Sequence, residues 1–254
     1  MFSNLIERLP MLLLSLPVIL FSLSVHECCH GYAALKLGDT TARNFGRLTL
    51  NPLKHIDPIG FICMVLFHFG WANPVPINTR NFKNPRRDMA LSALAGPLSN
   101  IVLAFVFGGL LRLALFGVTS AHEQDLTSVV GSLMSGGTAS VSSGFTVVAL
   151  LVYMLYLGVV INFSYAVFNL IPIPPLDGSR IFYVFLPPKW YFAVMKYERI
   201  IMIAMLALLW FGILDIPLNW AVGGLESVMF KLFGMNEQSS LALALIQIFV
   251  GTSL

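Results

Sequence analysis

Charged residues are scarce in this sequence: Asp, Glu, Lys and Arg together make up 11% of its 254 residues. A soluble domain of ordinary composition carries about a quarter charged residues, so the sequence excludes a soluble globular protein. The hydrophobic content of 57% instead indicates a protein that lies in a lipid bilayer. The formal net charge of +3 is too small for a nucleic-acid-binding surface, and we expect no nucleic-acid partner.

Cysteine is scarce as well. Cys28, Cys29 and Cys63 lack the spacing of a thiolate zinc site, and they indicate no disulfide framework. A small-x-small cleavage site is also missing after the first apolar run, so we expect this run to stay in the protein as a spanning helix. No stretch is long and polar enough to fold as an inserted soluble domain.

The apolar segments predict an all-α polytopic membrane protein with about four transmembrane helices, because a helix needs roughly 20 residues to cross the bilayer core. The predicted spans are residues 11–37, 89–117, 145–169 and the shorter segment 199–214. Residues 60–70 are apolar but too short to cross, which predicts a re-entrant segment. Imperfect alternation of apolar residues at 43–50 predicts a small β element.

The C-terminal region is predicted to form a helix that lies in the membrane interface. Apolar residues recur at helical spacing from Leu218 to Phe233, whereas Asn219, Glu226 and Lys231 lie off this stripe. A helix with one apolar and one polar face binds at the lipid–water boundary. We therefore divide the chain into a membrane core, residues 1–215, and an amphipathic extension, residues 216–254.

Basic residues predict the orientation in the membrane. They cluster in the segments 36–87 and 180–199, whereas residues 118–144 contain no Lys or Arg. The positive-inside rule therefore places the two basic segments in the cytoplasm and the N-terminus outside. Organelle signals are missing, so the expected location is the plasma membrane of a prokaryote.

The motif His26-Glu27-Cys28-Cys29-His30 lies inside the first apolar run. Two histidines at positions i and i+4 share one face of a helix, so both rings can bind one metal ion. Glu27 points far enough around the helix to reach a water on that metal without being a ligand. A lone helical histidine is more often a core residue, but ionisable clusters inside a membrane span are costly and mark functional sites. The motif therefore predicts a zinc hydrolase.

Asp177 is the predicted third zinc ligand. It follows the proline-rich segment 172–175, which prevents a regular helix, and it precedes Gly178, which lets the backbone turn. Irregular backbone at membrane depth is tolerated where it lines a polar cavity. The other candidates, which are better explained as solvated or structural residues, are His55, Asp57 and His68.

Two motifs together resemble the site-2 protease family of intramembrane zinc metallopeptidases. The family pairs H-E-x-x-H with a distant N-x-x-P-x-P-x-L-D-G, and residues 169–178, Asn-Leu-Ile-Pro-Ile-Pro-Pro-Leu-Asp-Gly, match every fixed position. The A-G-P-x-x-N run that ends at Asn100 also looks like a family feature. The resemblance implies one zinc ion per chain and a transmembrane protein as substrate. It implies zinc binding by His26, His30 and Asp177, acid–base catalysis by Glu27, and a substrate or oxyanion contact by Asn169.

Two other functions remain open from the residues alone. A metal transporter also needs intramembrane ligands, although it gives no role to Glu27 beside His26. A catalytically silent relative would only bind membrane proteins, although every expected catalytic position is filled. We further expect the substrate to unwind and to pair with an edge at residues 43–50. The sequence indicates neither the identity of the substrate nor the oligomeric state.

Overall fold

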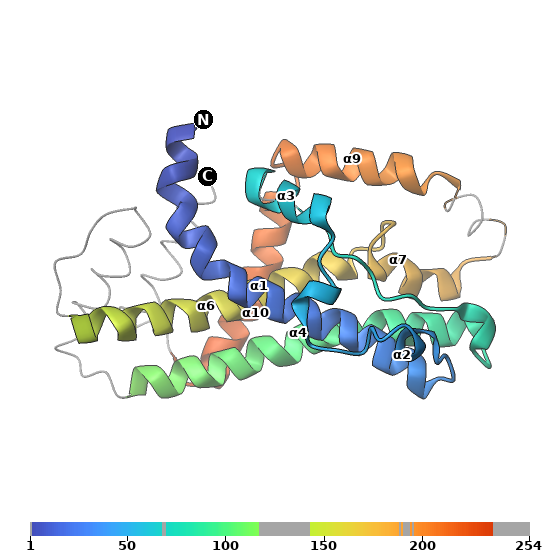
Figure 1. The fold of residues 1–254 in the computed structure, drawn as a ribbon, viewed down its shortest axis with the longest axis horizontal. Helices are drawn as coiled ribbons and strands as arrows, with labels where there is room; N and C mark the ends of the chain where they lie inside the picture. Colours follow the sequence, from blue (N-terminus) through green and yellow to red (C-terminus); the bar gives the residue numbers. More distant parts are fainter. Residues whose placement is uncertain are drawn as a thin grey trace. The chain divides into compact units, whose positions relative to one another are not determined.

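The computed structural model describes residues 2–67, 70–116, 143–187, 189, 194 and 196–235. Most of the described residues are helical and none belongs to a named strand, which confirms the predicted helical class. Figure 1 labels the α-helices. They are α1 (Phe2–Lys36), α2 (Thr41–Asn44), α3 (Pro58–Phe67), α4 (Pro85–Phe116), α6 (Ser143–Leu170), α7 (Asp177–Phe182), α9 (Glu198–Trp210) and α10 (Asp215–Leu232), with 3₁₀ turns at Pro52–Lys54, Thr79–Asn81 and Tyr183–Phe185.

Three of the described helices are long and apolar enough to cross a membrane. The candidate spans are Leu13–Lys36 in α1, Pro85–Leu115 in α4 and Leu150–Leu170 in α6, and they overlap the first three predicted spans. The fourth prediction, residues 199–214, holds α9, whose 13 residues are too few to cross alone. Helices α9 and α10 form a pair bent by 79°, which makes a fourth span if the pair is counted together.

The predicted β element at residues 43–50 is not confirmed. Its start belongs to α2, and the residues that follow form no strand. Gly46 has a φ of 62°, and the Arg47 N–H donates to the Ala42 carbonyl at 2.9 Å. This is the Schellman arrangement that ends a helix at a left-handed glycine, and it turns the chain where a strand would have to continue. An isolated antiparallel bridge pairs Ile56 with Ala72.

The chain divides into two compact units. One unit contains residues 1–19, 103–163 and 219–254, and the other contains residues 20–102 and 164–218. All the predicted metal ligands, together with Glu27 and Asn169, belong to the second unit. The predicted boundary after residue 215 stays a prediction, and residues 236–254 of the extension lie outside the described part.

One residue of helix α10 differs from the predicted arrangement of its faces, in the part of the helix, residues 219–232, that belongs to the first unit. Glu226, which was expected on the polar face, has only 5% of its surface exposed. It lies four residues after Val222 and three before Met229, so helical periodicity places it on the same buried face. The Met229 Sδ atom is 2.4 Å from the position of a Cβ at Gly108, so α10 packs closely on α4 at that glycine.

Close approach between α6 and α4 in the same unit depends on Gly158. A Cβ added there would lie 2.4 Å from the Cγ atom of Phe107, which is far shorter than a van der Waals contact. Glycine is the residue that allows transmembrane helices to approach in this way, since lipid-embedded helices associate through backbone packing. Phe107 therefore occupies the space that any other residue at position 158 would need.

The variant Gly158→Ala is expected to lower the free energy of unfolding by about 1–3 kcal/mol, because the added methyl group overpacks this contact. Thermal unfolding in detergent micelles measures the change. Gly109→Ala is the matched control, since its added Cβ meets Phe233 at an ordinary 3.7 Å. Equal melting temperatures for the two variants would contradict the packing argument.

Candidate metal centre

His26 and His30 project from one face of α1 toward each other. Their Nε2 atoms are 2.9 Å apart, and the two rings meet edge to face with centroids 4.5 Å apart. Both residues are buried. The predicted i, i+4 arrangement is therefore present in the structure, with two ring nitrogens directed at one point.

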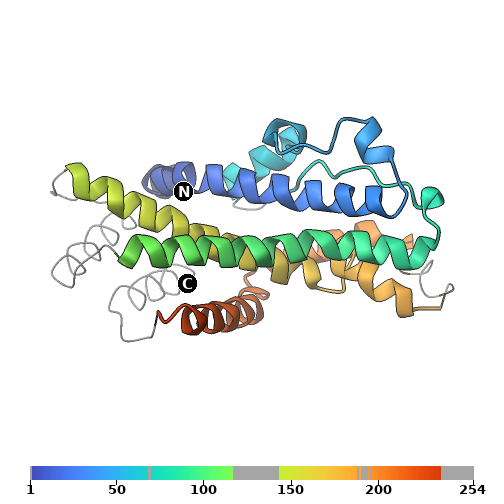
Figure 2. The same ribbon diagram turned by 90° about the horizontal axis from the view of Figure 1, so that it is seen from below.

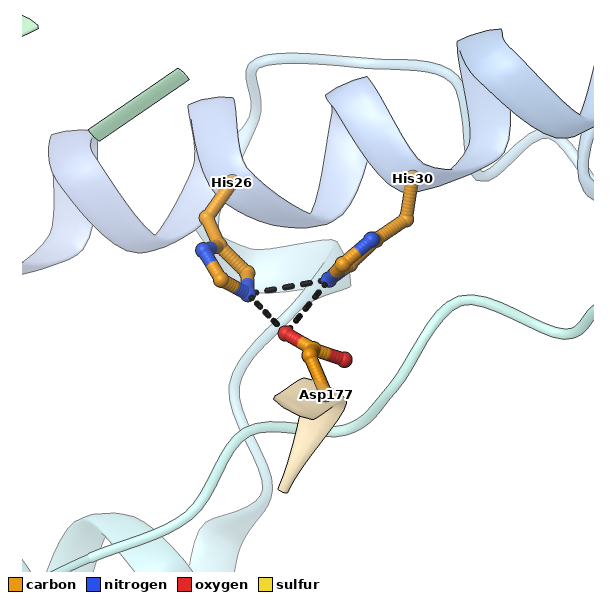
Figure 3. A group of neighbouring side chains, drawn as sticks. All are labelled: His26, His30 and Asp177. Carbon is orange, nitrogen blue, oxygen red and sulfur yellow. Dashed lines mark hydrogen bonds and ion pairs between the residues drawn. The ribbon is translucent and has the colours of Figure 1, made fainter. Parts of the chain in front are cut away.

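Asp177 reaches the same point from a distant part of the chain, as Figure 3 shows. Its Oδ2 atom lies 3.2 Å from the His26 Nε2 atom and 3.1 Å from the His30 Nε2 atom. Leu176 is extended, and the helical turn α7 begins at Asp177 itself. A Cβ on Gly178 would lie 2.2 Å from the Leu170 carbonyl oxygen, so only glycine lets α7 begin so close to the end of α6.

The three side chains fit a zinc ion. Each offers one ligand atom, and all three atoms lie within 4.8 Å of one another. In a tetrahedral zinc site with zinc–nitrogen bonds of about 2.0–2.1 Å, ligand atoms are roughly 3.3 Å apart. The observed separations of 2.9, 3.1 and 3.2 Å are close to that spacing. Two imidazoles and one carboxylate also leave a fourth position for water, as catalytic zinc sites require.

Helix α4 holds both imidazole rings through their Nδ1 atoms, on the side away from the centre of the group. The His26 Nδ1–H donates to the Asn100 Oδ1 atom at 2.6 Å, and the His30 Nδ1–H donates to the Ser92 carbonyl at 2.8 Å. Both partners are acceptors, so the proton of each neutral ring lies on Nδ1 and the Nε2 lone pair faces the centre. Such partners fix the tautomer and ring orientation of metal-binding histidines. In Figures 1 and 2 the histidine-bearing half of α1 runs alongside the start of α4.

Gly96 provides the space that the rings occupy. A Cβ at this position would lie 2.4 Å from the His30 Nε2 atom and 2.7 Å from the His26 Cε1 atom. Gly96 and Asn100 are four residues apart on one face of α4, within the A-G-P-x-x-N run. From the sequence, this run was noted only as a resemblance to a family feature, and neither Gly96 nor Asn100 was predicted to contact the histidines. The Ser92 carbonyl was missed because a backbone acceptor has no sequence signal.

Glu27 lies beside this group but outside it. Its Oε2 atom accepts a hydrogen bond from the Val75 N–H at 2.8 Å, and the carboxylate is buried with 8% of the residue exposed. The metal-ligand group of the described residues does not include Glu27. The structure therefore leaves this carboxylate available for a role other than metal binding.

The remaining predicted residues have other contacts. The Asn169 amide donates to the Tyr165 carbonyl at 3.0 Å, and its catalytic role stays a prediction. His55 Nε2 lies 2.8 Å from the Thr49 carbonyl, and Asp57 accepts from the Gly60 N–H, so both have structural partners. His68 lies outside the described residues.

Three comparisons with known proteins bear on this site. The model of Peptidase family M50 matches residues 15–212. Two relatives carry the name "Putative zinc metalloprotease". YwhC of Bacillus subtilis (strain 168) is 38% identical over 183 residues, which are 72% of each chain. Rip2 of Mycolicibacterium smegmatis is 31% identical over 163 residues, which are 63% of this chain and 52% of Rip2. No solved structure matches the chain.

The variant Asn100→Ala is expected to raise the dissociation constant for zinc about 10–100-fold, because His26 loses the acceptor that fixes its tautomer and orientation. Competition with a zinc chelator measures this constant. Asn100→Asp keeps an acceptor oxygen and should bind zinc more tightly than Asn100→Ala. If Asn100→Ala retains the affinity of the wild type, the hydrogen bond to His26 does not support the site.

Proposed function

The chain belongs to peptidase family M50, and from this membership we propose that it is an intramembrane zinc metalloprotease that cuts other membrane proteins in or near their transmembrane segments. It is a zinc metallopeptidase and an integral membrane protein. The observation that carries the intramembrane assignment is the position of His26 and His30 within Leu13–Lys36, a helix long and apolar enough to span the bilayer. Peptide bonds inside the bilayer are the substrates that a site at this depth would meet.

We assign His26, His30 and Asp177 as the ligands of one zinc ion per chain. When bound, zinc lowers the pKa of a coordinated water toward about 7 and polarises the carbonyl of the peptide bond. The protein's part is to hold the three ligand atoms at this spacing. Asn100 and Ser92 contribute by holding the imidazole rings in the orientation that directs Nε2 toward the ion.

Glu27 is proposed as the general base and acid. Its carboxylate takes a proton from the attacking water and then gives that proton to the nitrogen of the leaving amine, so the carboxylate ends the cycle unchanged. A non-ligand carboxylate next to a zinc ligand suits this role because it remains free to change protonation state. Asn169 is proposed to donate its amide to the oxygen of the scissile carbonyl. In that role its side chain exchanges the Tyr165 carbonyl for the substrate.

The proposed substrate is a transmembrane segment that unwinds locally. Inside a helix the peptide carbonyl is already hydrogen-bonded and sterically covered, so hydrolysis needs an extended stretch. The non-helical residues 171–176 precede Asp177 and are the proposed lining of the space where that stretch lies.

The variant Glu27→Gln is expected to keep its zinc while hydrolysis of a transmembrane test substrate falls at least about a hundredfold, since the amide cannot accept the proton. Zinc content and cleavage are measured on the same preparation in detergent. Glu198→Gln, a matched change in α9, should retain both. Wild-type turnover in Glu27→Gln would exclude the proposed role, and zinc transport into vesicles without any cleavage would favour a transporter.

We also propose that the site opens to the cytoplasm and that the N-terminus lies outside, in the plasma membrane of a prokaryote. The support is the charge of the segment between α1 and α4, since Arg43, Lys54, Arg80 and Lys83 are all exposed. The positive-inside rule places such a segment in the cytoplasm. Asp177 and the C-terminal end of α1 then lie toward the same side.

In a protein whose three native cysteines are replaced by alanine, Arg43→Cys and Arg180→Cys should react with an impermeant thiol reagent only from the cytoplasmic side, because both positions are exposed and lie in basic segments. Labelling of right-side-out and inverted vesicles makes the measurement. Val102→Cys is the control, since it lies exposed inside the span Pro85–Leu115 and should react from neither side. Labelling of Arg43→Cys from the external side would reverse the orientation.

A further inference from the structure

An irregular segment of the second unit makes direct contact with the proposed general base. Residues 71–76 lie between α3 and α4 and form no helix. The N–H of Val75 in this segment donates to Glu27 Oε2 at 2.8 Å, and the hydrogen bond is buried. Val75 itself is 7% exposed and Glu27 is 8% exposed. Water is therefore largely excluded from a contact between residues that are far apart in the sequence.

Three contacts hold this segment in place. Arg47 donates through Nη2 to the Asn73 carbonyl at 2.7 Å and to the Pro74 carbonyl at 3.3 Å. The Asn73 N–H donates to the His55 carbonyl at 2.8 Å. The residues just before Val75 are thus bound through two carbonyl groups and one N–H, so the segment is fixed independently of its contact with Glu27.

Asp39 anchors the chain after Val75. Its Oδ2 atom accepts from the Asn78 N–H at 2.7 Å, and its Oδ1 atom accepts from the Asn81 amide at 2.7 Å. Burial raises the pKa of the Asp39 carboxyl, but the hydrogen bonds from Thr41, Asn81 and Asn78 outweigh burial and hold this pKa below its ordinary value. The carboxylate therefore stays ionised at neutral pH and keeps accepting these bonds.

Gly31 lets the segment approach α1. A Cβ at Gly31 would lie 2.6 Å from the Leu48 Cδ2 atom and 3.0 Å from the Val75 Cγ1 atom. Gly31 follows Glu27 by four residues and so lies on the same face of the helix. The absence of a side chain there allows Val75 to lie against α1 at the depth where its N–H reaches the carboxylate.

The sequence around Val75 allows only one register. Pro74 and Pro76 flank it, and proline has no backbone N–H. A shift of the segment by one residue in either direction would therefore remove the donor to Glu27. Among the described residues no other donor reaches this carboxylate, so its hydrogen bonding depends on the Val75 N–H.

We propose that Val75 is a positioning residue that holds the general base through its backbone N–H. The hydrogen bond immobilises Oε2, so that Oε1 is presented to the proton of the attacking water. The Val75 N–H bond stays intact throughout, since the proton that Glu27 takes comes from the water and leaves with the amine. This inference rests on the proposed proteolytic function.

The variant Val75→Pro removes the N–H and should lower kcat about 10–100-fold, the range typical for supporting contacts of a metal site. KM and zinc content should change less than about twofold, because no ligand or substrate contact is removed. Val75→Ala keeps the N–H and should therefore have a kcat close to that of the wild type and well above that of Val75→Pro. A folded, zinc-loaded Val75→Pro variant with the kcat of the wild type would overturn the proposal.

A double-mutant cycle separates positioning from general damage. In the Glu27→Gln background, whose residual cleavage is followed over long incubations, Val75→Pro should cost nothing further, because residues that act as one unit are non-additive. Full additivity of the two losses would overturn the proposal. If Val75→Pro fails to fold, Arg47→Ala replaces it, since this variant releases the Asn73 and Pro74 carbonyls, and Arg47→Lys is its control. An Arg47→Ala variant with the kcat of the wild type, or one additive with Glu27→Gln, would equally overturn the proposal.

A second readout needs neither zinc nor a substrate. Val75 supplies the one exchangeable amide between Pro74 and Pro76, so hydrogen–deuterium exchange at this amide reports the bond directly in metal-free protein. Exchange should be slow in the wild type and faster in Glu27→Ala, and equal rates would overturn the proposal. If cleavage depends on Glu27 but not on Val75, only this inference fails. If the wild-type protein cleaves no substrate at all, the proposed function fails and this inference falls with it.

Discussion

The structure of the second unit depends on one requirement: two imidazole rings buried in an apolar helix need polar partners. Each ring nitrogen that cannot reach water must be hydrogen-bonded or bound to a metal, because an unpaired polar group in a lipid-facing bundle costs several kcal/mol. His26 and His30 meet this requirement on one side through Asn100 and the Ser92 carbonyl. On the other side, the Nε2 atoms and the Asp177 carboxylate would share the proposed zinc ion. The same contacts fix the places of α4 and α7 against α1.

The requirement extends to Glu27, and there it fixes a segment that is not helical. A buried carboxylate needs a donor, and Val75 provides one from between two prolines. Residues 71–76 are therefore held by hydrogen bonds to Glu27, Arg47 and His55. The glycines at positions 31, 96 and 178 serve the same end, since each removes a Cβ that would occupy the space of a contacting group.

Much of the site could be predicted from sequence because its determinants are local. The i, i+4 spacing places His26 and His30 on one helical face, and the proline-rich segment before Asp177 forces the chain out of a helix. Non-local and backbone contacts could not be predicted in this way, as the Ser92 carbonyl and the Val75 N–H show. The strand predicted at 43–50 is not confirmed, because Gly46 reverses the chain. Of the residues predicted on the polar face of α10, Glu226 packs inward, whereas Asn219 and Lys231 are exposed.

We propose that one zinc ion joins α1 to α7 through two imidazoles and one carboxylate. X-ray absorption at the zinc edge of the purified protein tests it most directly, because Cys28 and Cys29 lie between the two histidines and would be the competing ligands. Only nitrogen and oxygen scatterers at about 2.0–2.2 Å are expected, with the multiple-scattering pattern of two imidazoles. A sulfur scatterer at about 2.3 Å, or a spectrum unchanged in Asp177→Ala, would contradict it.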